Sequence, residues 1–315
     1  MKHILTPLAL TLIAAPALAQ DKMTVMLDWF INPDHGPIIL AEENGYFTDA
    51  GLEVELISPA DPNDPPRMVA AGRVDLAVSY QPELHLAQRE GLDLRRVGTL
   101  VETPLTCLVV RADGPVKEMA DLKGRKVGFA VSGVQEMLLD AMLSHHGVAP
   151  SEVEQINIGW SISPALMSGQ VDGVIGAFRN FELNQMQIEG HEGRCFYPEA
   201  EGVPAYDELI YVAHAEDMDR EMIARFLRAT ERAAADIVND PAASGETFFA
   251  SDAELRNELN TRAWEDTWPR FATRPAAVDH GRYDRFEAFM QESGVVETVI
   301  PAADLVVDVT AQAKP

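Results

Sequence analysis

The chain has 315 residues, 47% of them hydrophobic, and its 25 basic and 50 acidic side chains give a formal net charge of −25 at pH 7. A chain of this length can bury a substantial core and usually divides into two domains. So acidic a protein repels phosphate backbones and anionic lipids, which excludes nucleic acid as an expected partner and favours solubility.

The first 19 residues have the features of a secretory signal peptide. A short basic start precedes a mostly apolar run at residues 4–15, and Ala17-Leu18-Ala19 fits a small-x-small cleavage site. The apolar run is shorter than the roughly 20 residues that span a bilayer, and no later stretch is long and apolar enough. No Cys stands at the cut, which argues against a lipid anchor. We therefore expect a soluble protein exported to the periplasm and not embedded in the membrane.

The mature chain opens with alternating strand and helix patterns. A strand is expected at residues 22–29, and a helix follows from Pro37, because Pro is tolerated in the first turn of a helix. Residues 52–58 alternate and are rich in β-formers, and residues 65–80 indicate a helix ending at Gly72 followed by a strand. The alternation continues to residue 100, which is typical of a mostly parallel sheet covered by helices.

A second series of the same kind begins near residue 125. It predicts a strand at 125–133, a helix at 134–147, a strand at 153–160, and a helix with a strand at 163–178. The last piece, "PALMSGQVDGVIGAF", repeats the pattern of the earlier "PRMVAAGRVDLAVSY", a short helix, Gly-x-Val-Asp and an apolar strand ending in an aromatic residue. Each copy occupies the same place in its own series, which favours two lobes of similar architecture.

The last third of the chain differs, because from residue 217 it is largely helical. Strand-like pieces at 105–111 and 208–213 are expected to form paired crossovers between the lobes. The fold class is therefore α/β, with two βα lobes, two hinge strands and a helical C-terminal region. We expect the first part of lobe 1 at residues 20–108, lobe 2 at 109–208, and a return strand with helices completing lobe 1 at 209–315.

Two cysteines do not make a disulfide framework, and no His/Cys spacing resembles a metal site. A bridge between Cys107 and Cys195 is possible in an oxidising compartment. However, Cys107 lies in the apolar run "LTCLVV" and is typical of a core residue. The sequence leaves open whether the two pair.

In open α/β sheets, ligands bind beyond the carboxyl ends of the strands, where loops can vary on a rigid base. Four segments occupy such ends, at residues 28–35, 80–82, 131–133 and 178–182. Their aromatic, amide and carboxylate side chains suit a flat heteroaromatic ring, which offers faces for stacking and edges for hydrogen bonds. The residues predicted to bind the ligand are Asp28, Trp29, Asn32, His35, Tyr80, Gln81, Ser132, Gly133, Phe178, Arg179, Asn180, Glu182, Tyr206 and Asp207.

Many of these residues also have an ordinary structural interpretation. Trp29 can be core at a strand end, and Asp28 can cap the helix that starts at Pro37. Asn32 and Asp34 can be turn formers.

Two further candidates also have a structural interpretation. His35 can support its loop, and Ser132-Gly133 can simply begin a helix. No catalytic residue is predicted, because the sequence contains no G-x-S-x-G, G-x-x-x-x-G-K-[ST] or H-E-x-x-H motif.

Several specific strings resemble the periplasmic substrate-binding proteins of ABC importers for thiamine pyrimidine precursors, which are relatives of the yeast pyrimidine synthase. The strings are "LDWFINPDHGPIILAEENGYF", "PADPNDPP", "AAGRVDLAVSYQPELHLA", "GTLVETPL", "SPALMSGQVDGVIGAFRNFELNQ" and "YDELIYVA". The resemblance covers nearly the whole mature chain. It implies a type II periplasmic-binding-protein fold that closes on a ligand such as formylaminopyrimidine or hydroxymethylpyrimidine.

The synthase branch of that family holds pyridoxal phosphate on a lysine and has a cysteine-rich iron motif. Residues 77–85 of this chain contain no lysine, and no cysteine run precedes residue 206. Schiff-base chemistry therefore lacks its nucleophile, so we expect neither a cofactor nor an enzyme.

The expected function is that of a monomeric periplasmic receptor that presents an aminopyrimidine to an ABC permease. Trp29 and Tyr80 would stack on the ring, amides of Asn32, Gln81 and Asn180 would meet its polar edge, and Glu182 would accept hydrogen bonds from the exocyclic amine. A riboflavin-type binder stays open as an alternative. An alkanesulfonate or nitrate binder also stays open, although such a site should hold more basic residues than Arg179 alone. A pyridoxal-phosphate-dependent synthase is the less favoured alternative.

Overall fold

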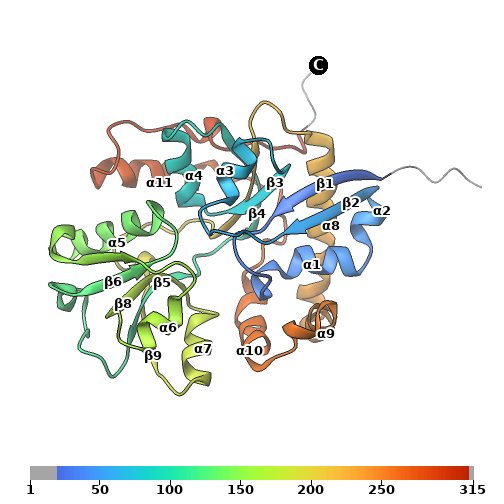
Figure 1. The fold of residues 1–315 in the computed structure, drawn as a ribbon. Helices are drawn as coiled ribbons and strands as arrows, with labels where there is room; N and C mark the ends of the chain where they lie inside the picture. The colour runs from blue at the N-terminus through green and yellow to red at the C-terminus, as the bar shows by residue number, and fades with distance from the viewer. Residues whose placement is uncertain (1–19, 312–315) are drawn as a thin grey trace, which may run out of the picture.

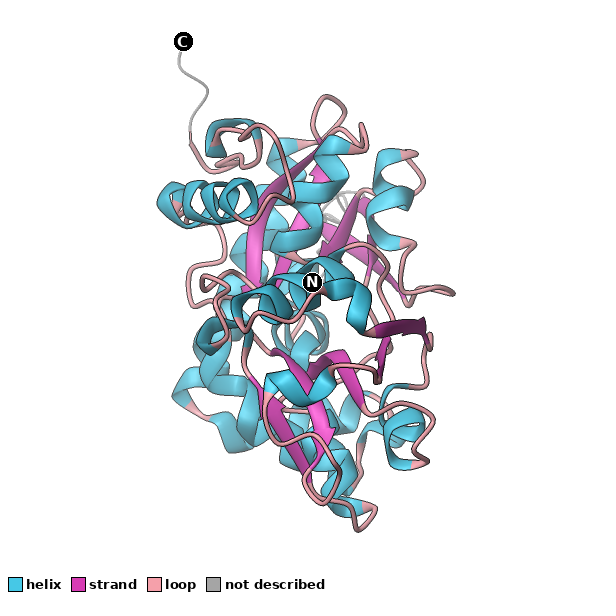
Figure 2. Ribbon diagram, turned by 90° about the vertical axis from the view of Figure 1, so that its left-hand side faces the viewer, coloured by secondary structure: helices cyan, strands magenta, loops and turns pink. Residues whose placement is uncertain are grey.

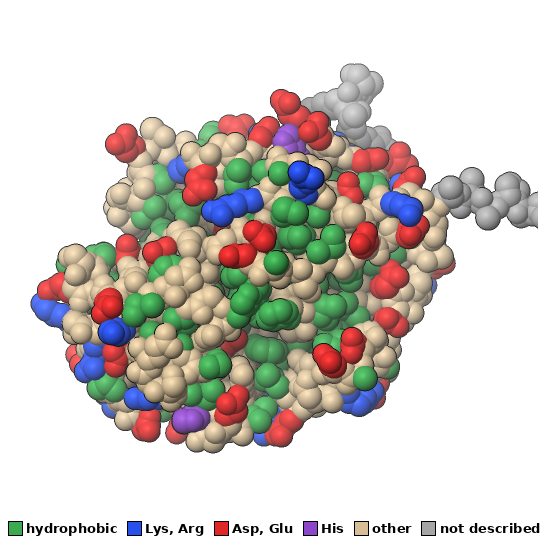
Figure 3. All heavy atoms as spheres, in the orientation of Figure 1, with side chains coloured by type: hydrophobic (Ala, Val, Ile, Leu, Met, Phe, Trp, Pro, Cys, Tyr) green, Lys and Arg blue, Asp and Glu red, His purple; other side chains and the backbone are tan. Residues whose placement is uncertain are grey.

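The computed structural model describes residues 20–311, so the predicted signal peptide lies outside the described residues. The chain forms two five-stranded sheets, each flanked by helices, as the ribbon views show (Figures 1 and 2). Within residues 20–311, no helix combines the length and hydrophobicity needed to cross a membrane. On the face shown in Figure 3, acidic side chains are scattered and hydrophobic ones gather near the middle.

The first sheet has the strand order β2-β1-β3-β10-β4. β1 lies parallel to β2 and β3, whereas β10 runs antiparallel to β3 and β4. The strands are β1 (Asp21–Met26), β2 (Leu52–Ile57), β3 (Leu76–Ser79), β4 (Leu94–Val101) and β10 (Leu209–His214). The helices of this lobe are α1 (Gly36–Glu43), α2 (Tyr46–Asp49), α3 (Pro65–Ala70), α4 (Gln81–Arg89), α8 (Arg220–Asn239), α9 (Pro241–Ser251), α10 (Glu258–Thr267) and α11 (His280–Glu292), with short 3-10 turns at Pro33–His35, Ala253–Leu255, Trp268–Arg270 and Ala302–Asp304.

The second sheet repeats this plan with the order β7-β6-β8-β5-β9. β6 lies parallel to β7 and β8, and β5 runs antiparallel to β8 and β9. The strands are β5 (Thr106–Arg111), β6 (Lys126–Phe129), β7 (Glu154–Asn157), β8 (Gly173–Phe178) and β9 (Gly193–Phe196). The helices are α5 (Val134–His145), α6 (Ile162–Met167) and α7 (Glu182–Ile188), with 3-10 turns at Met119–Leu122, Pro150–Glu152 and Pro198–Ala200.

Local sequence explains how these elements form. All four residues of β3, "LAVS", are buried, as expected for a central strand covered on both faces. The longest helix, α8, begins at an aspartate cap, because the Asp219 carboxylate accepts a hydrogen bond from the backbone N–H of Met222 at 2.9 Å. Its buried face carries Phe226, which stacks on Phe47 of α2 with 5.1 Å between ring centroids. The C-terminal helices therefore share the core of the first lobe.

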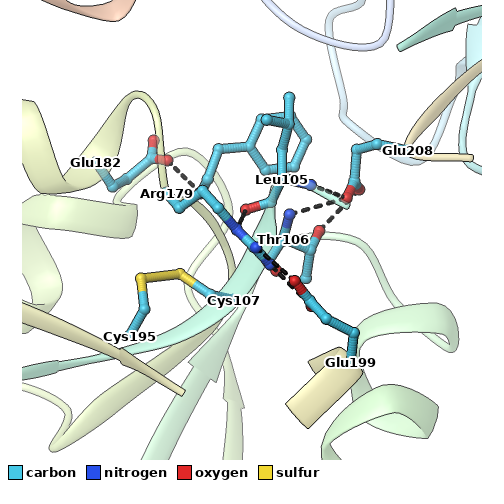
Figure 4. Close-up of a disulfide and its surroundings, with 9 residues drawn as sticks. Leu105, Thr106, Cys107, Arg179, Glu182, Cys195, Glu199 and Glu208 are labelled. Carbon is cyan, nitrogen blue, oxygen red and sulfur yellow. Dashed lines mark hydrogen bonds and ion pairs between the residues drawn. A yellow bond between two sulfur atoms is a disulfide. The ribbon is translucent and has the colours of Figure 1, made fainter. Parts of the chain in front are cut away.

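The two strand-like pieces expected at the crossovers are strands, β5 and β10, but they do not pair with each other. β5 pairs only within the second sheet and β10 only within the first, so the chain changes sheet at residues 102–105 and again at 197–208. The expected boundary after residue 108 therefore falls inside β5, whose whole length pairs with the second sheet. The two crossing segments are linked by a side chain and not by paired strands. The buried Glu208 carboxylate accepts hydrogen bonds from the backbone N–H groups of Leu105, at 2.6 Å, and Thr106, at 2.8 Å (Figure 4).

Cys107 and Cys195 form a disulfide between the neighbouring strands β5 and β9 (Figure 4). The side chain of Cys107 is also fully buried, so the sequence-based prediction of a core residue is correct and the pairing adds to it. The bridge links residues 88 apart in sequence. A cross-link of that span restricts the unfolded chain and typically stabilises a fold by about 2–4 kcal/mol.

Candidate functional site

A pocket with an empty volume of about 400 Å³ lies between the two lobes. Residues that follow β1 and β3 line it from the first lobe, and residues around β8 and the start of α5 line it from the second. It therefore sits beyond the carboxyl ends of strands, where ligands of open α/β sheets bind. The lining residues are Asp28, Trp29, Asn32, Asp34, Tyr80, Gln135, Ile162, Gly176, Phe178, Phe181 and Glu182.

Six of the predicted binding residues belong to this lining. They come from three of the four predicted segments and are Asp28, Trp29, Asn32, Tyr80, Phe178 and Glu182. The Asn32 amide is partly committed to its own loop, because its Oδ1 accepts from the backbone N–H of Asp34 at 2.8 Å. Asn32 therefore acts both as the turn former and as a pocket residue.

Asp28 is held by two hydrogen bonds in the first-lobe wall. The Tyr80 hydroxyl donates to its Oδ2 at 2.9 Å, and Nε2 of His35 lies 2.9 Å from its Oδ1. Nδ1 of His35 accepts from the backbone N–H of Asn32 at 3.3 Å, which assigns the ring proton to Nε2. Burial and the Asp28 carboxylate raise the pKa of Tyr80 well above its usual value, so the hydroxyl keeps its proton. His35, predicted to contact the ligand, instead supports Asp28 from behind.

Asp34 belongs to the same pocket lining and joins the two lobes. Its Oδ1 accepts from Nδ2 of Asn180, at 2.6 Å, and from the hydroxyl of Thr267, at 3.2 Å. Burial raises the pKa of Asp34 to about 6, although these hydrogen bonds act in the opposite direction. Asn180 was predicted to meet the ligand directly, but it lies outside the pocket lining and its Nδ2 is committed to Asp34 and Thr267.

Glu182 is the carboxyl group of the second-lobe wall. Its Oε2 accepts from the backbone N–H of Phe178 at 2.6 Å, and its side chain is buried (Figure 4). Burial, reinforced by the negative charge of Asp34, raises the pKa of Glu182 to about 8. At neutral pH this carboxyl group is therefore largely protonated and can donate as well as accept a hydrogen bond.

Aromatic rings from both lobes surround these carboxyl groups. Trp29 of the first lobe lies 4.3 Å, between ring centroids, from Trp160 of the second, and Phe30 lies 4.5 Å from the same ring. Also in the pocket lining, Tyr80 and Phe178 meet edge to face, with 6.4 Å between ring centroids. A flat ligand thus finds apolar faces beside polar groups, a composition typical of small-molecule sites.

Two predicted residues turn away from the pocket because other backbone groups hold them. The buried Gln81 accepts from the backbone N–H of Asp207 at 2.8 Å. Arg179 donates to the carbonyl oxygens of Leu105 and Thr106, and it forms an ion pair with Glu199 at 2.6 Å (Figure 4). Its guanidinium group therefore binds the end of the crossing at residues 102–105 and does not face the pocket.

Four more predicted residues also lie outside the lining. Asp207 forms an ion pair with Arg282 in the first lobe. Tyr206 lines a neighbouring cavity with an empty volume of about 240 Å³. The segment Ser132-Gly133 lies at the outer edge of the cleft, where the backbone N–H of Ser132 donates to Asn63 of the other lobe at 2.8 Å.

Sequence reasoning missed five lining residues. Asp34 stood in a predicted segment but was interpreted as a turn former, and Phe181 stood between two predicted residues. Gln135 and Gly176 had weaker signals, a polar residue in the first turn of a helix and a glycine inside a buried strand. Ile162 carried no signal at all.

Comparison with known proteins places the chain in a family. Residues 32–244 match the model described as NMT1/THI5 like. A Haemophilus influenzae protein whose name assigns it to thiamine biosynthesis is 46% identical, over 95% of both chains. The formylaminopyrimidine-binding protein of Halalkalibacterium halodurans is 34% identical, over 71% of this chain and 68% of its own. The 4-amino-5-hydroxymethyl-2-methylpyrimidine phosphate synthase of Schizosaccharomyces pombe is 27% identical, over 81% and 77%.

The fold is also shared with solved structures. The periplasmic aliphatic sulphonate binding protein of Escherichia coli superposes with a TM-score of 0.72 at 17% identity, over 93% of this chain and 94% of that one. The predicted periplasmic-binding-protein fold, with a helical C-terminal region, is thereby confirmed. Since the family model covers most of the chain and a relative is nearly half identical over almost its full length, the protein belongs to the NMT1/THI5-like family.

Proposed function

We propose that the protein is a periplasmic receptor that binds a thiamine pyrimidine precursor, of the formylaminopyrimidine or hydroxymethylpyrimidine type, and delivers it to an ABC permease. One observation carries the proposal: carboxyl groups from both lobes, Asp28, Asp34 and Glu182, face a pocket that is otherwise walled by aromatic and amide side chains. An aminopyrimidine offers the matching groups, since it combines a flat ring with an exocyclic amine donor and ring-nitrogen acceptors.

Glu182 is the best-placed partner for the amino edge of the ring. The protonated carboxyl group would donate one hydrogen bond to a ring nitrogen. Its other oxygen would accept a second hydrogen bond from the exocyclic amine. A hydrogen bond between neutral groups contributes about 0.5–1.5 kcal/mol, and a good aromatic contact adds about 0.5–1.5 kcal/mol beyond burial. A few such contacts, with ring burial, could reach the roughly 8 kcal/mol of a micromolar complex after the cost of ordering.

The same lining argues against an anionic ligand. No Lys or Arg belongs to the described pocket lining, so a sulfonate or nitrate would meet three acidic side chains and no cation. The likeness to the sulphonate binding protein therefore concerns the fold.

The pocket lining does not fit pyridoxal phosphate, the cofactor of the family's synthase branch. A Schiff base needs an amine nucleophile, and the described pocket lining contains no lysine. The phosphate would also lie among carboxyl groups with no positive charge to balance it. We therefore propose binding without chemical conversion of the ligand.

Delivery to a permease requires that the ligand be enclosed and released. Contacts between the lobes already flank the pocket, from Asn180 to Asp34 on one side and from Ser132 to Asn63 on the other. The flexible element would be the two crossing segments, which Glu208 and Arg179 hold together. We propose that the protein acts as a monomer whose two lobes close over the ring and present a joint surface to the permease.

Titration calorimetry of the purified mature protein tests the proposal. Formylaminopyrimidine or hydroxymethylpyrimidine should release heat with 1:1 stoichiometry, whereas riboflavin and taurine should not. Binding of taurine alone would contradict the proposal. Formation of a pyrimidine product after addition of pyridoxal phosphate and iron would contradict the proposed absence of catalysis.

A further inference from the structure

Gln135, the second residue of α5, folds its side chain back onto the loop that precedes the helix. Its Oε1 accepts from two backbone N–H groups, those of Ala130 at 2.7 Å and Val131 at 3.1 Å. The opposite amide orientation would place the NH₂ group against two other donors, so the hydrogen bonds fix which end is the oxygen. The amide nitrogen, Nε2, is therefore the free end of this side chain.

Gly176 makes the space that the amide occupies. β8 pairs with β5 through Cys107↔Ala177 and Leu108↔Ile175, so Gly176 is the extra residue of a β-bulge. Its φ of +87° favours glycine, and a Cβ there would lie only 2.1 Å from Nε2 of Gln135. A side chain at position 176 would thus displace the amide, which rests directly on the glycine.

Both residues line the pocket between the lobes, and Gln135 is buried, with 8% of its surface exposed. Among residues 20–311, none is hydrogen-bonded to Nε2 of Gln135, whereas the Tyr80 hydroxyl, another donor in the lining, is already committed to Asp28. The fixed amide therefore adds an uncommitted donor to the pocket lining.

We propose that Gln135 is a specificity-determining residue, whose Nε2 donates a hydrogen bond to an acceptor atom of the ligand, a ring nitrogen or a formyl oxygen. The inference rests on the proposed pyrimidine binding and deepens it. Glu182 would bind the edge of the ring that carries the exocyclic amine. Gln135 would select ligands that have a hydrogen-bond acceptor at the edge of the ring that faces α5. A flat molecule without an acceptor at that position leaves the Gln135 donor unpaired and binds more weakly.

Substitutions at position 135 separate donation to the ligand from support of the loop. Gln135→Glu keeps an oxygen for the backbone N–H groups of Ala130 and Val131 but replaces the donor with an acceptor. At pH 8, Gln135→Glu should bind hydroxymethylpyrimidine or formylaminopyrimidine about 10- to 100-fold more weakly than the wild type at the same pH. Affinity should recover partly at pH 5, where the introduced carboxyl can be protonated and donate. If Gln135 only supports the loop, Gln135→Glu binds as the wild type does, and that result would overturn the inference.

Ligand analogues provide a second readout that is independent of folding. The probes are formylaminopyrimidine and analogues that lack one ring nitrogen or the formyl oxygen. Loss of the atom that Gln135 contacts should weaken binding to the wild type by about 10-fold and binding to Gln135→Met hardly at all. Equal losses in both proteins for every analogue would overturn the inference while leaving the proposed function intact. Failure of the wild type to bind any of these pyrimidines would instead contradict the proposed function, and the role of Gln135 with it.

Discussion

The buried carboxyl group of Glu182 should make the stability of the protein fall as the pH rises. Burial raises the pKa of Glu182 from 4.5 to about 8 in the folded protein. Between pH 5 and pH 8 the folded state therefore keeps a proton that the unfolded chain releases. Each pH unit in that window costs up to 1.36 kcal/mol, so this group's contribution to the free energy of unfolding should decrease by up to about 4 kcal/mol between pH 5 and pH 8.

Glu182→Gln isolates this effect, because the amide cannot ionise and still offers an oxygen to the backbone N–H of Phe178. Urea unfolding of the two proteins from pH 5 to pH 8 should show the variant gaining stability relative to the wild type, by up to about 4 kcal/mol over the range. Other buried carboxyl groups with raised pKa values, such as Asp34 and Glu208, are present in both proteins, so their contributions largely cancel.

Glu189→Gln serves as the matched control, because Glu189 lies exposed at the end of the same helix. Its stability relative to the wild type should not change with pH. A difference between Glu182→Gln and the wild type that stays constant across the range would refute the reasoning. It would mean that Glu182 is already ionised in the folded protein at pH 5 and that burial does not raise its pKa.

Three further substitutions test separate contacts. Tyr80→Phe keeps the ring but removes the donor to Asp28, and should weaken hydroxymethylpyrimidine binding by about 1–2 kcal/mol in calorimetry; unchanged affinity would show that the hydroxyl does not organise the site. Trp160→Ala removes the ring that contacts Trp29 and should cost about 0.5–1.5 kcal/mol of binding, measured by the same titration; a loss of all binding would point to direct ligand contact instead. Replacing Cys107 and Cys195 together by Ala should lower the free energy of unfolding by about 2–4 kcal/mol in urea while leaving the ligand affinity within about twofold, since the bridge lies outside the pocket lining; an unchanged unfolding midpoint would argue against the bridge.

Local patterns in the sequence were enough to predict most elements and part of the pocket. Alternation of strand and helix patterns predicted β1 to β3 and β6 to β8, because the spacing of apolar residues in each element depends only on a few neighbouring residues. Aromatic and acidic residues directly after strands, among them Asp28, Tyr80 and Glu182, predicted pocket residues because the end of a strand fixes their position.

The direction of neighbouring side chains could not be predicted, because it depends on partners far away in the chain. Tyr80 faces the pocket, yet Gln81 beside it turns to the backbone of Asp207, 126 residues later. Arg179 is drawn to carbonyl oxygens near residue 105, and Asn180 is drawn to Asp34. The strands expected at 105–111 and 208–213 join different sheets for the same reason, since strand partners follow from the assembled sheets.

A crystal structure of the mature protein with hydroxymethylpyrimidine tests the central claim most directly. The account predicts the ring in the pocket between the lobes, beside Trp29 and Tyr80, with its amino edge within hydrogen-bond distance of the Glu182 carboxyl group. A ring bound at another site, or a ring in this pocket with its amino group turned away from all three carboxyl groups, would contradict it.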